Sequence, residues 1–363
     1  MTDTTPLPIR FAIVGGGWRA EFFTRIAKAM PDRFKITGVM LRDPAKAAAF
    51  SAKWGAPAVE SYEALAKTDP EFVVLSVDRM VRLEPLKALA ELKLWVLCET
   101  PPAPDLASLM EVWSLVENKG LRLKVAEQYF QQPLHAARMK VIADGRLGKV
   151  TSARVSIAHA FHGVSLMRKF LGVLYEDTTI RARRFVSQAL EGPTRDGWGE
   201  AERMVPTKQM LGEFDYGDKL GLFDFTDVQY RSPVHSHRAV IRGERGEIAD
   251  LEMRTMERFG HPLVQKFRRE GTGEDGNLDG FALERIYCGD QEVWQNPFPG
   301  VRLMDDEIAI ALVLQQMGER MRGIGRGPYG FSEAAQDQYL NLMMAKAADT
   351  GETIRTTRQP WAH

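Results

Sequence analysis

The fold is decided by IRFAIVGGGWRA, residues 9–20 of a 363-residue chain. The apolar run Ile9–Val14 is typical of a buried β-strand and leads directly into three glycines. The residues that follow, Trp18–Met30, place apolar side chains such as Phe22 and Ile26 at the spacing of one helix face. A strand, a glycine-rich turn and a helix in this order predict the first unit of a doubly wound α/β domain.

The glycines fit the pattern G-x-G-x-x-A, which binds the pyrophosphate of a dinucleotide. We expect Gly15 to allow the tight turn, Gly17 to let the backbone approach the pyrophosphate, and Ala20 to let the helix pack on the strand. The N–H groups at the helix start would face the phosphates. A plain structural turn is the alternative, but the position of the motif at the first strand–helix junction favours nucleotide binding.

Strands and helices alternate through the first third of the chain. Further strands are expected at Phe34–Leu41, Phe72–Val77, Leu94–Cys98 and Leu121–Ala126, and helices at Ala45–Lys53, Val81–Leu92 and Asp105–Asn118. Strands separated by helices of this length pair in parallel through right-handed crossovers. Residues 1–128 are therefore predicted to form a Rossmann domain with a doubly wound parallel sheet that binds NAD(P).

The pattern changes after residue 133. A helix at Leu134–Asp144 precedes β runs at Val150–His159, Leu222–Tyr230, Ser236–Arg242 and Glu247–Met256, loops at Glu191–Glu202 and Gly271–Gly280, and helices at Asp305–Met321 and Ser332–Ala348. Short turns such as Gly243–Gly246 join neighbouring β runs as in a hairpin. Residues 129–363 are predicted to form an α+β domain with a mainly antiparallel open sheet, used for substrate binding and oligomerisation.

The β run Leu222–Tyr230 bears on assembly, because its large apolar side chains fall at both odd and even positions. The predicted helices suffice to cover one face of the sheet, so the other face needs a different cover. A homodimer or homotetramer built on the C-terminal sheet is the expectation.

Composition excludes several classes of protein. Lys and Arg total 48, as do Asp and Glu, so the formal net charge is +0 and no basic excess exists to bind nucleic acid. No run reaches the roughly 18 apolar residues of a membrane span, and Met1–Arg10 lacks the pattern of a signal peptide. Two cysteines are too few for a disulfide scaffold. A cytoplasmic enzyme is expected.

The end of the second predicted strand bears on the choice of cofactor. An acidic residue there would accept hydrogen bonds from the ribose hydroxyls of NAD, but the chain has Leu41-Arg42-Asp43. Arg42 could pair with the 2′-phosphate of NADP or stack on adenine, and Asp43 could be a helix N-cap. The cofactor is therefore NAD or NADP, with NADP favoured; a solvated Arg42 is the alternative.

Six short motifs stand in order along the chain: Gly15–Ala20, Tyr62–Leu65, Glu99–Pro101, Tyr129…Pro133, Gly145…Val150 and His162…Gly172. This ordered set resembles the Gfo/Idh/MocA oxidoreductases, named for glucose–fructose oxidoreductase and inositol dehydrogenase. The resemblance implies a Rossmann domain, a C-terminal α/β domain with an open antiparallel sheet, bound NAD(P), sugar- or polyol-like substrates, and oligomers that pair the open sheets. The residues expected to contact the cofactor are Gly15, Gly17, Trp18, Arg19, Arg42, Ser76, Glu99, Thr100 and Gln128.

The chain departs from the family at two catalytic positions. The family typically has Glu-Lys-Pro where this chain has Glu99-Thr100-Pro101, so the lysine ammonium is absent. The family also often has Asp and His four residues apart at a helix start, and here Ala158 stands four residues before His162. The loop that usually precedes this helix is expected to be missing. Thr100 can then only orient the substrate or the nicotinamide.

His162 is the surviving titratable group of the family's Lys, Asp and His. Oxidising an alcohol by hydride transfer needs a proton acceptor within hydrogen-bond reach of the hydroxyl, and a histidine can serve. A buried structural histidine is the alternative. Arg168 and Lys169, two turns along the same predicted helix, could supply positive charge, although a solvated Lys169 is favoured. Tyr129, after the sixth strand, is a candidate acid, although packing is favoured.

The sequence indicates no metal site. His235 and His237 could share one face of a strand, but no third ligand has a recognisable spacing. The segment Asp275–Gly280 matches half of an EF-hand loop, yet its twelfth position is Ile286 rather than glutamate. The acidic run Asp305–Glu307 is expected to complement a helix dipole.

The sequence therefore predicts an NAD(P)-dependent oxidoreductase that transfers a hydride to or from a carbohydrate or polyol-like substrate. One alternative is an enzyme that oxidises its substrate transiently to cleave or rearrange a glycosidic bond with no net redox change. The other is a nucleotide-binding protein without catalysis, suggested by Thr100 and Ala158.

Overall fold

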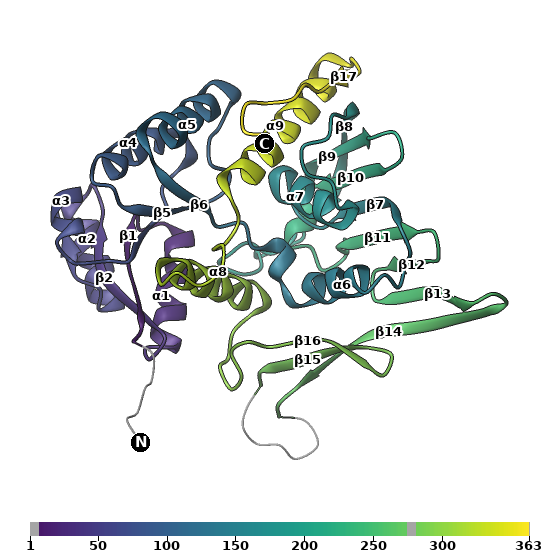
Figure 1. Ribbon diagram of the computed structural model, residues 1–363, viewed down its shortest axis with the longest axis horizontal. Coiled ribbons are helices and arrows are strands. Elements are labelled where there is room, and N and C mark those ends of the chain that lie inside the picture. The colour runs from purple at the N-terminus through teal and green to yellow at the C-terminus, as the bar shows by residue number, and fades with distance from the viewer. Residues whose placement is uncertain (1–6, 274–280, 363) are drawn as a thin grey trace. The chain divides into compact units, whose positions relative to one another are not determined.

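The computed structural model describes residues 7–273 and 281–362 (Figure 1). The chain divides into two compact units. The first comprises Met1–Pro133, Gly271–Glu284 and Asn296–Ala335, and the second comprises Leu134–Glu270, Arg285–Gln295 and Gln336–His363. The first unit is thus discontinuous in sequence, which a single boundary near residue 128 does not express.

The first unit is built on a parallel sheet with the strand order β3-β2-β1-β4-β5-β6. Its strands are β1 (Ile9–Val14), β2 (Phe34–Met40), β3 (Ala58–Val59), β4 (Phe72–Leu75), β5 (Trp95–Cys98) and β6 (Arg122–Val125). Its first helices are α1 (Trp18–Ala29), α2 (Pro44–Trp54), α3 (Tyr62–Ala66), α4 (Leu83–Glu91) and α5 (Leu106–Lys119), with short 3₁₀ turns η1 (Arg79–Val81) and η2 (Tyr129–Gln131). The predicted doubly wound parallel sheet is confirmed.

Helices lie on both sides of this sheet, with α4 and α5 on one side and α1 on the other (Figure 1). The central strands are consequently buried on both faces, and Phe11, Ile13 and every residue of β4 are fully buried. Helices α2 and α5 begin at side-chain caps, since Asp43 accepts from two backbone N–H groups of the first turn and Asp105 accepts from one. Asp43 therefore caps a helix, as the sequence suggested.

Helix α8 (Asp305–Met321) belongs to this first unit although it follows most of the second in sequence. It packs against α1, β1 and β4. The approach to β1 is close, because a Cβ on Gly318 would lie 2.5 Å from Ile9 Cδ1. Sequence periodicity predicts this helix correctly but contains no information on which sheet it covers.

The second unit is built on an eleven-stranded sheet in the order β16-β15-β14-β13-β12-β11-β7-β10-β9-β8-β17. The strands are β7 (Val150–Ser156), β8 (Thr179–Leu190), β9 (Met204–Asp215), β10 (Leu220–Thr226), β11 (Arg238–Gly243), β12 (Gly246–Ala249), β13 (Glu252–Arg258), β14 (His261–Gly271), β15 (Leu283–Cys288), β16 (Gln291–Gln295) and β17 (Ile354–Arg355). The helical elements are α6 (Pro133–Ala143), α7 (Ala160–Leu171), α9 (Phe331–Thr350) and the 3₁₀ turn η3 (Asp227–Tyr230). Among the described strand pairs of this sheet, β7 and β10 run parallel and the others run antiparallel, so the mainly antiparallel sheet is confirmed.

Two predicted strands end differently. The run Leu222–Tyr230 leaves the sheet after Thr226, because Thr226 and Gln229 form a capping box that starts η3. The run Glu247–Met256 is two strands, β12 and β13, joined at Asp250, whose φ is +54°. The expected loop Glu191–Glu202 is confirmed between β8 and β9. The segment Asp275–Gly280 lies outside the described residues.

The two faces of β10 differ in character. Phe223 and Phe225 lie on one face and are buried beside α7. Leu222 lies on the other face, where Asp224 pairs with Arg154. The open face therefore mixes apolar side chains with ion pairs, whereas the sequence suggested large apolar groups on both faces.

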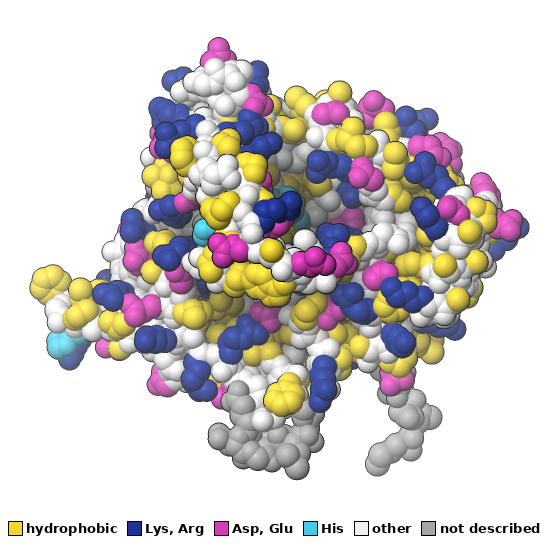
Figure 2. All heavy atoms as spheres, turned by 180° about the vertical axis from the view of Figure 1, so that it is seen from behind, with side chains coloured by type: hydrophobic (Ala, Val, Ile, Leu, Met, Phe, Trp, Pro, Cys, Tyr) yellow, Lys and Arg dark blue, Asp and Glu magenta, His cyan; other side chains and the backbone are white. Residues whose placement is uncertain are grey.

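Charges of both signs are interspersed over the face shown in Figure 2, in keeping with the balanced composition. Within residues 7–273 and 281–362, no helix is both long enough and apolar enough to cross a membrane.

Candidate functional site

A pocket of about 760 Å³ opens at the carboxyl ends of β1, β2 and β4. It is lined by the glycine loop, by the residues that follow β2 and β4, and by the start of α4. The strand order reverses between β1 and β4, and this is the point where an open α/β sheet binds its ligand. Gly15, Gly17, Arg42 and Ser76, all expected to contact a nucleotide, line this one pocket.

The glycines of the loop have separate structural reasons. Gly15 has a φ of +110°, and a Cβ there would lie 2.1 Å from the Ser76 carbonyl oxygen. A Cβ on Gly16 would lie 2.4 Å from Leu41 Cδ2. A Cβ on Gly17, the N-cap of α1, would meet no described atom within 4 Å. Packing therefore requires the first two glycines, and the open space over Gly17 suits a phosphate at the helix start.

The residues after β2 form one end of the pocket. Asp43 Oδ1 accepts from the backbone N–H groups of Ala45 at 3.0 Å and Lys46 at 3.2 Å, so its carboxylate is engaged in capping α2. Arg42 and Lys46 both line the pocket. Burial and the nearby Glu84 carboxylate raise the pKa of the Tyr62 hydroxyl, while the charge of Arg42 acts in the opposite direction. This end of the pocket therefore presents two cations, with a tyrosine and a carboxylate beside them.

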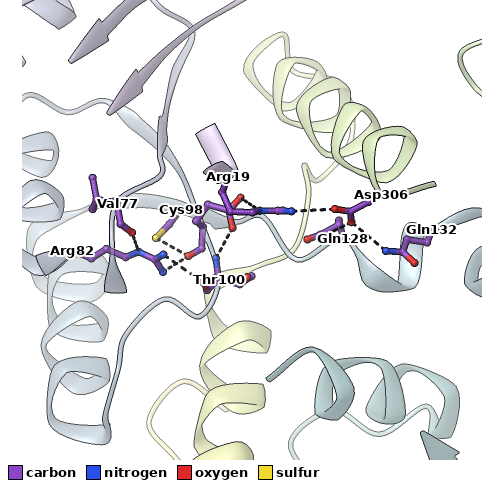
Figure 3. A network of polar contacts seen from close by, with 9 residues as sticks. Arg19, Val77, Arg82, Cys98, Thr100, Gln128, Gln132 and Asp306 are labelled. Carbon is purple, nitrogen blue, oxygen red and sulfur yellow. Dashed lines mark hydrogen bonds and ion pairs between the residues drawn. The ribbon is translucent and has the colours of Figure 1, made fainter. Parts of the chain in front are cut away.

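An ion-pair network lies at the carboxyl ends of β5 and β6 (Figure 3). Arg19 Nε donates to Glu99 Oε1 at 3.1 Å, and Arg19 Nη1 donates to Asp306 Oδ2 at 3.1 Å. Burial alone would lower the pKa of the Arg19 guanidinium, but the two carboxylates raise it overall. Arg19 is thus a fixed cation one residue into α1.

Asp306 also accepts from two glutamines. Gln128 Nε2 donates to Asp306 Oδ1 at 2.9 Å, and Gln132 Nε2 donates to the same oxygen at 3.2 Å (Figure 3). The other end of the Gln128 amide, Oε1, is buried and accepts no hydrogen bond from the described residues. Sequence reasoning assigned Asp306 only to a helix start, because no sequence signal pairs residues 287 positions apart.

The buried side chain of Arg82, which is 5% exposed, stabilises the turn that contains Thr100. Arg82 Nε donates to the Val77 carbonyl at 3.0 Å (Figure 3). Its Nη1 donates to the carbonyls of Glu99 and Pro101. Thr100 N donates to Glu99 Oε2 at 3.1 Å. Sequence reasoning missed Arg82, since a lone arginine before a helix is ordinarily solvated.

Glu127 and Tyr129 follow β6. Glu127 is fully buried, and this burial raises the pKa of its carboxyl well above the ordinary value. The negative charges of Glu99 and Asp306 raise this pKa further. The backbone N–H of Tyr129, which donates to Glu127 Oε1 at 3.2 Å, lowers it. Tyr129 begins η2 and is half-buried.

Trp18 lies outside the lining of the pocket. It is the first residue of α1, is 39% exposed, and packs edge-on against Phe22 with 4.7 Å between ring centroids. Its expected contact with the cofactor therefore stays a prediction.

In the second unit, His162 is the third residue of α7, and α7 begins at Ala160, four residues after Ser156 ends β7. A helix that directly follows the strand, with the longer loop missing, agrees with the sequence. His162 is 8% exposed, and its ring lies edge-on to that of His159, with 5.1 Å between centroids. His159 is the exposed N-cap of α7 and also contacts Tyr230. Sequence reasoning overlooked His159, which had no counterpart in the family pattern.

Arg168 and Lys169, near the end of α7, differ from each other. Arg168 is buried and pairs with the fully buried Asp337, so the suggestion that Arg168 supplies positive charge to a site is wrong. Lys169 is half-buried in the last turn of the helix.

In the part of the chain that the structure describes, no three His, Cys, Asp or Glu side chains form a cluster that could hold a metal ion. His235 and His237 precede β11 rather than sharing a strand, and His237 Nε2 lies 3.1 Å from the Gln229 carbonyl. The idea of a strand with paired histidines was wrong, because the strand begins only at Arg238.

Comparison with known proteins agrees with this architecture. Residues 9–127 match the profile of the Gfo/Idh/MocA family, described as an oxidoreductase family with an NAD-binding Rossmann fold. An uncharacterised oxidoreductase of Schizosaccharomyces pombe is 30% identical over 148 residues, which cover 39% of this chain and 40% of that protein. Trans-1,2-dihydrobenzene-1,2-diol dehydrogenase of Macaca fuscata fuscata is 31% identical over 153 residues, covering 41% of this chain and 45% of that protein.

The whole chain also resembles solved structures. Levoglucosan dehydrogenase, solved with NADH and L-sorbose, superimposes with a TM-score of 0.68 at 16% identity, covering 98% of this chain and all of that one. At such identity the likeness concerns the fold. The curated relatives align over less than half of their own length.

The similarity to the Gfo/Idh/MocA oxidoreductase family therefore lies in the Rossmann domain, over residues 9–127.

Proposed function

We propose that the protein is an NAD(P)-dependent oxidoreductase that transfers a hydride to or from a carbohydrate or polyol-like substrate. The observation that carries this proposal is the glycine loop at the end of β1, where Gly17 leaves open space beside the start of α1 and lines the pocket. The loop lies within the residues that match a family of NAD-binding oxidoreductases. The activities for which two similar proteins are named, trans-1,2-dihydrobenzene-1,2-diol dehydrogenase and levoglucosan dehydrogenase, support a polyol or sugar as substrate.

The residues present fit a nicotinamide dinucleotide. The glycine loop would hold the pyrophosphate, and the residues after β2 would hold the adenosine ribose. The buried Gln128 Oε1, which lacks a donor among the described residues, lies at the end of β6 in the half of the sheet that takes the second nucleotide. When bound, the nicotinamide would accept or supply the hydride.

His162 is the proposed proton acceptor for the substrate hydroxyl, or the proton donor in the reverse direction. It is a titratable side chain near the helix start that matches the family's histidine. Thr100 is proposed to orient the substrate or the nicotinamide, because a hydroxyl cannot replace the basicity of the lysine found in the family. Tyr129 and Lys169 are the next candidates for moving a proton.

NADP is the proposed preferred cofactor. Leu41 cannot accept from a ribose hydroxyl, Asp43 is engaged as a helix cap, and Arg42 and Lys46 both line that end of the pocket. Arg42→Ala should therefore weaken NADPH binding at least about fivefold more than NADH binding, as measured by fluorescence titration. Arg326→Ala, which removes an exposed arginine outside the pocket, is the control. Equal losses for both nucleotides would contradict the preference.

The proposed activity is tested by nicotinamide absorbance at 340 nm with a panel of sugars, polyols and their acids. Net formation or loss of reduced cofactor with at least one of them is the expected result. A product formed without net absorbance change would favour the isomerising or glycoside-cleaving alternative. Tight binding of nucleotide with no turnover on any of them would favour a non-catalytic role.

A further inference from the structure

Asp306 joins residues from two parts of the chain that are far from it in sequence, Arg19 at one place and Gln128 with Gln132 at the other. Its carboxylate accepts from Arg19 in the first turn of α1, from Gln128 after β6, and from Gln132 after η2 (Figure 3). The donor–acceptor distances are 3.1, 2.9 and 3.2 Å. One side chain therefore fixes groups at both the pyrophosphate end and the β6 end of the sheet edge.

The carboxylate also decides which way the Gln128 amide faces. An ionised carboxylate only accepts hydrogen bonds, so the NH₂ group of Gln128 must face Asp306 and Oε1 must face away. Gln128 is 2% exposed, and its Oε1 has no partner among the described residues. A buried acceptor without a donor is unfavourable, and a ligand that brings an N–H group would satisfy it.

The place of Gln128 indicates what that ligand group is. In a sheet with this strand order, one mononucleotide half is formed by β1 to β3 and the other by β4 to β6. The glycine loop belongs to the first half, which takes the adenosine and the pyrophosphate. The end of β6 belongs to the second half, which takes the nicotinamide. The carboxamide of nicotinamide carries two N–H donors.

Arg19 is fixed by the same contact. Glu99 and Asp306 each take one of its five N–H donors, which leaves three for other acceptors beside the start of α1. A guanidinium held between two carboxylates keeps one orientation, so these donors point in a fixed direction next to the phosphate-binding helix end.

We propose that Asp306 is a positioning residue for the nicotinamide half of the cofactor. It orients Gln128 so that Oε1 accepts from the nicotinamide carboxamide, and it holds Arg19 beside the pyrophosphate. This inference rests on the proposed function.

The test compares each dinucleotide with its 3-acetylpyridine analogue, which keeps the carbonyl of the carboxamide but has a methyl group in place of the NH₂. Affinities are measured by isothermal titration calorimetry on the full chain, using NAD⁺ or NADP⁺, whichever binds more tightly. The wild type should prefer the natural cofactor about tenfold, the effect of leaving one buried acceptor unsatisfied. Asp306→Asn lets the amide of Gln128 turn over, so the preference should fall to about twofold or less.

Two controls separate positioning from folding. ADP-ribose, or its 2′-phosphate, keeps the pyrophosphate but lacks nicotinamide, so its affinity should fall less in Asp306→Asn than the affinity of the dinucleotide does. Asp305→Asn removes the same charge from the same helix end and should keep the full preference for the carboxamide.

Three results would overturn the inference: no preference in the wild type, an unchanged preference in Asp306→Asn, or a loss of ADP-ribose affinity in that variant as large as the loss for the dinucleotide. A wild type that binds neither NAD(H) nor NADP(H) would instead overturn the proposed function.

Discussion

At the scale of single residues, the glycine loop separates packing from ligand binding. Gly15→Ala adds a methyl group 2.1 Å from the Ser76 carbonyl at a φ of +110°, so we expect it to lower the free energy of unfolding by about 1–3 kcal/mol or more. Gly17→Val places its side chain in open space, so we expect an unchanged melting temperature and the loss of nucleotide binding. Thermal unfolding and fluorescence titration of both variants check this.

Gly17→Ala is the matched control, since a single methyl group should weaken binding less than the valine does. Nucleotide affinity that stays unchanged in Gly17→Val would show that the helix start does not hold the pyrophosphate. A Gly15→Ala variant as stable as the wild type would show that the turn after β1 can relax.

Glu127 should make stability depend on pH. Its burial raises the pKa in the folded state above the ordinary value of 4.5, so the folded protein holds this proton more tightly than the unfolded chain. The stabilisation is complete below pH 4.5 and is lost as pH rises toward the raised value in the folded state. Glu127→Gln stays neutral, so its melting temperature should match that of the wild type near pH 4 and exceed it near pH 8.

Glu117→Gln, which neutralises an exposed carboxylate on α5, should leave the pH dependence unchanged. Parallel curves of melting temperature against pH for Glu127→Gln and the wild type would mean that the carboxyl ionises in the folded protein without cost.

At the scale of secondary structure, α7 carries the proposed catalytic base. His162→Asn keeps the size and hydrogen-bonding ability of the side chain but removes its basicity, so turnover should fall by about 10²–10⁴-fold. Nucleotide affinity should barely change, because the nucleotide pocket is formed by other elements. Steady-state kinetics and titration check both parts.

Lys169→Gln, on the same helix, is the comparison for His162→Asn. Full turnover in His162→Asn would rule out this base, and Tyr129 and Lys169 would then be tested next.

The sequence predicts some elements better than others for physical reasons. Five strands of the first sheet were predicted, because helices cover both faces of the sheet and the central strands read as short apolar runs. The two-residue strand β3 (Ala58–Val59) was missed, since it is too short to show a pattern. The longest strands of the second sheet, β8 and β9, were missed. Arg181, Arg183 and Arg184 place charge on successive positions of β8, where one face lies open, so neither an apolar run nor a clean alternation marks the strand.

The site shows the same limit. The motif Gly15–Gly17 and the cap Asp43 are local in sequence, and both were predicted. The network of Arg19, Glu99 and Asp306 depends on α8 returning to the first unit, which no local pattern encodes.

At the scale of the whole molecule, we predict a dimer or tetramer built on the open face of the second sheet. That face combines Leu211 and Leu222 with the ion pairs of Arg154 with Asp224 and Arg181 with Glu213, a mixture found at subunit interfaces. Multi-angle light scattering at micromolar concentration should give at least twice the mass of one chain, 40.8 kDa. Leu222→Asp should shift the assembly toward the monomer.

Leu174→Asp changes an exposed leucine in the turn after α7 and should leave the assembly intact. A wild type that elutes and scatters as a monomer would contradict the prediction.

The return of α8 to the first sheet has a consequence for synthesis in the cell. The segment from β1 to β6 emerges from the ribosome long before Asp305–Met321 is translated, and this later helix packs on α1, β1 and β4. The nascent nucleotide-binding unit therefore emerges with part of its apolar surface uncovered, and it must wait for nearly two hundred further codons before that surface is sealed. A nonsense mutation within Leu134–Glu270 would leave the whole glycine loop in the truncated product, yet without helix α8, which packs on α1 and β1.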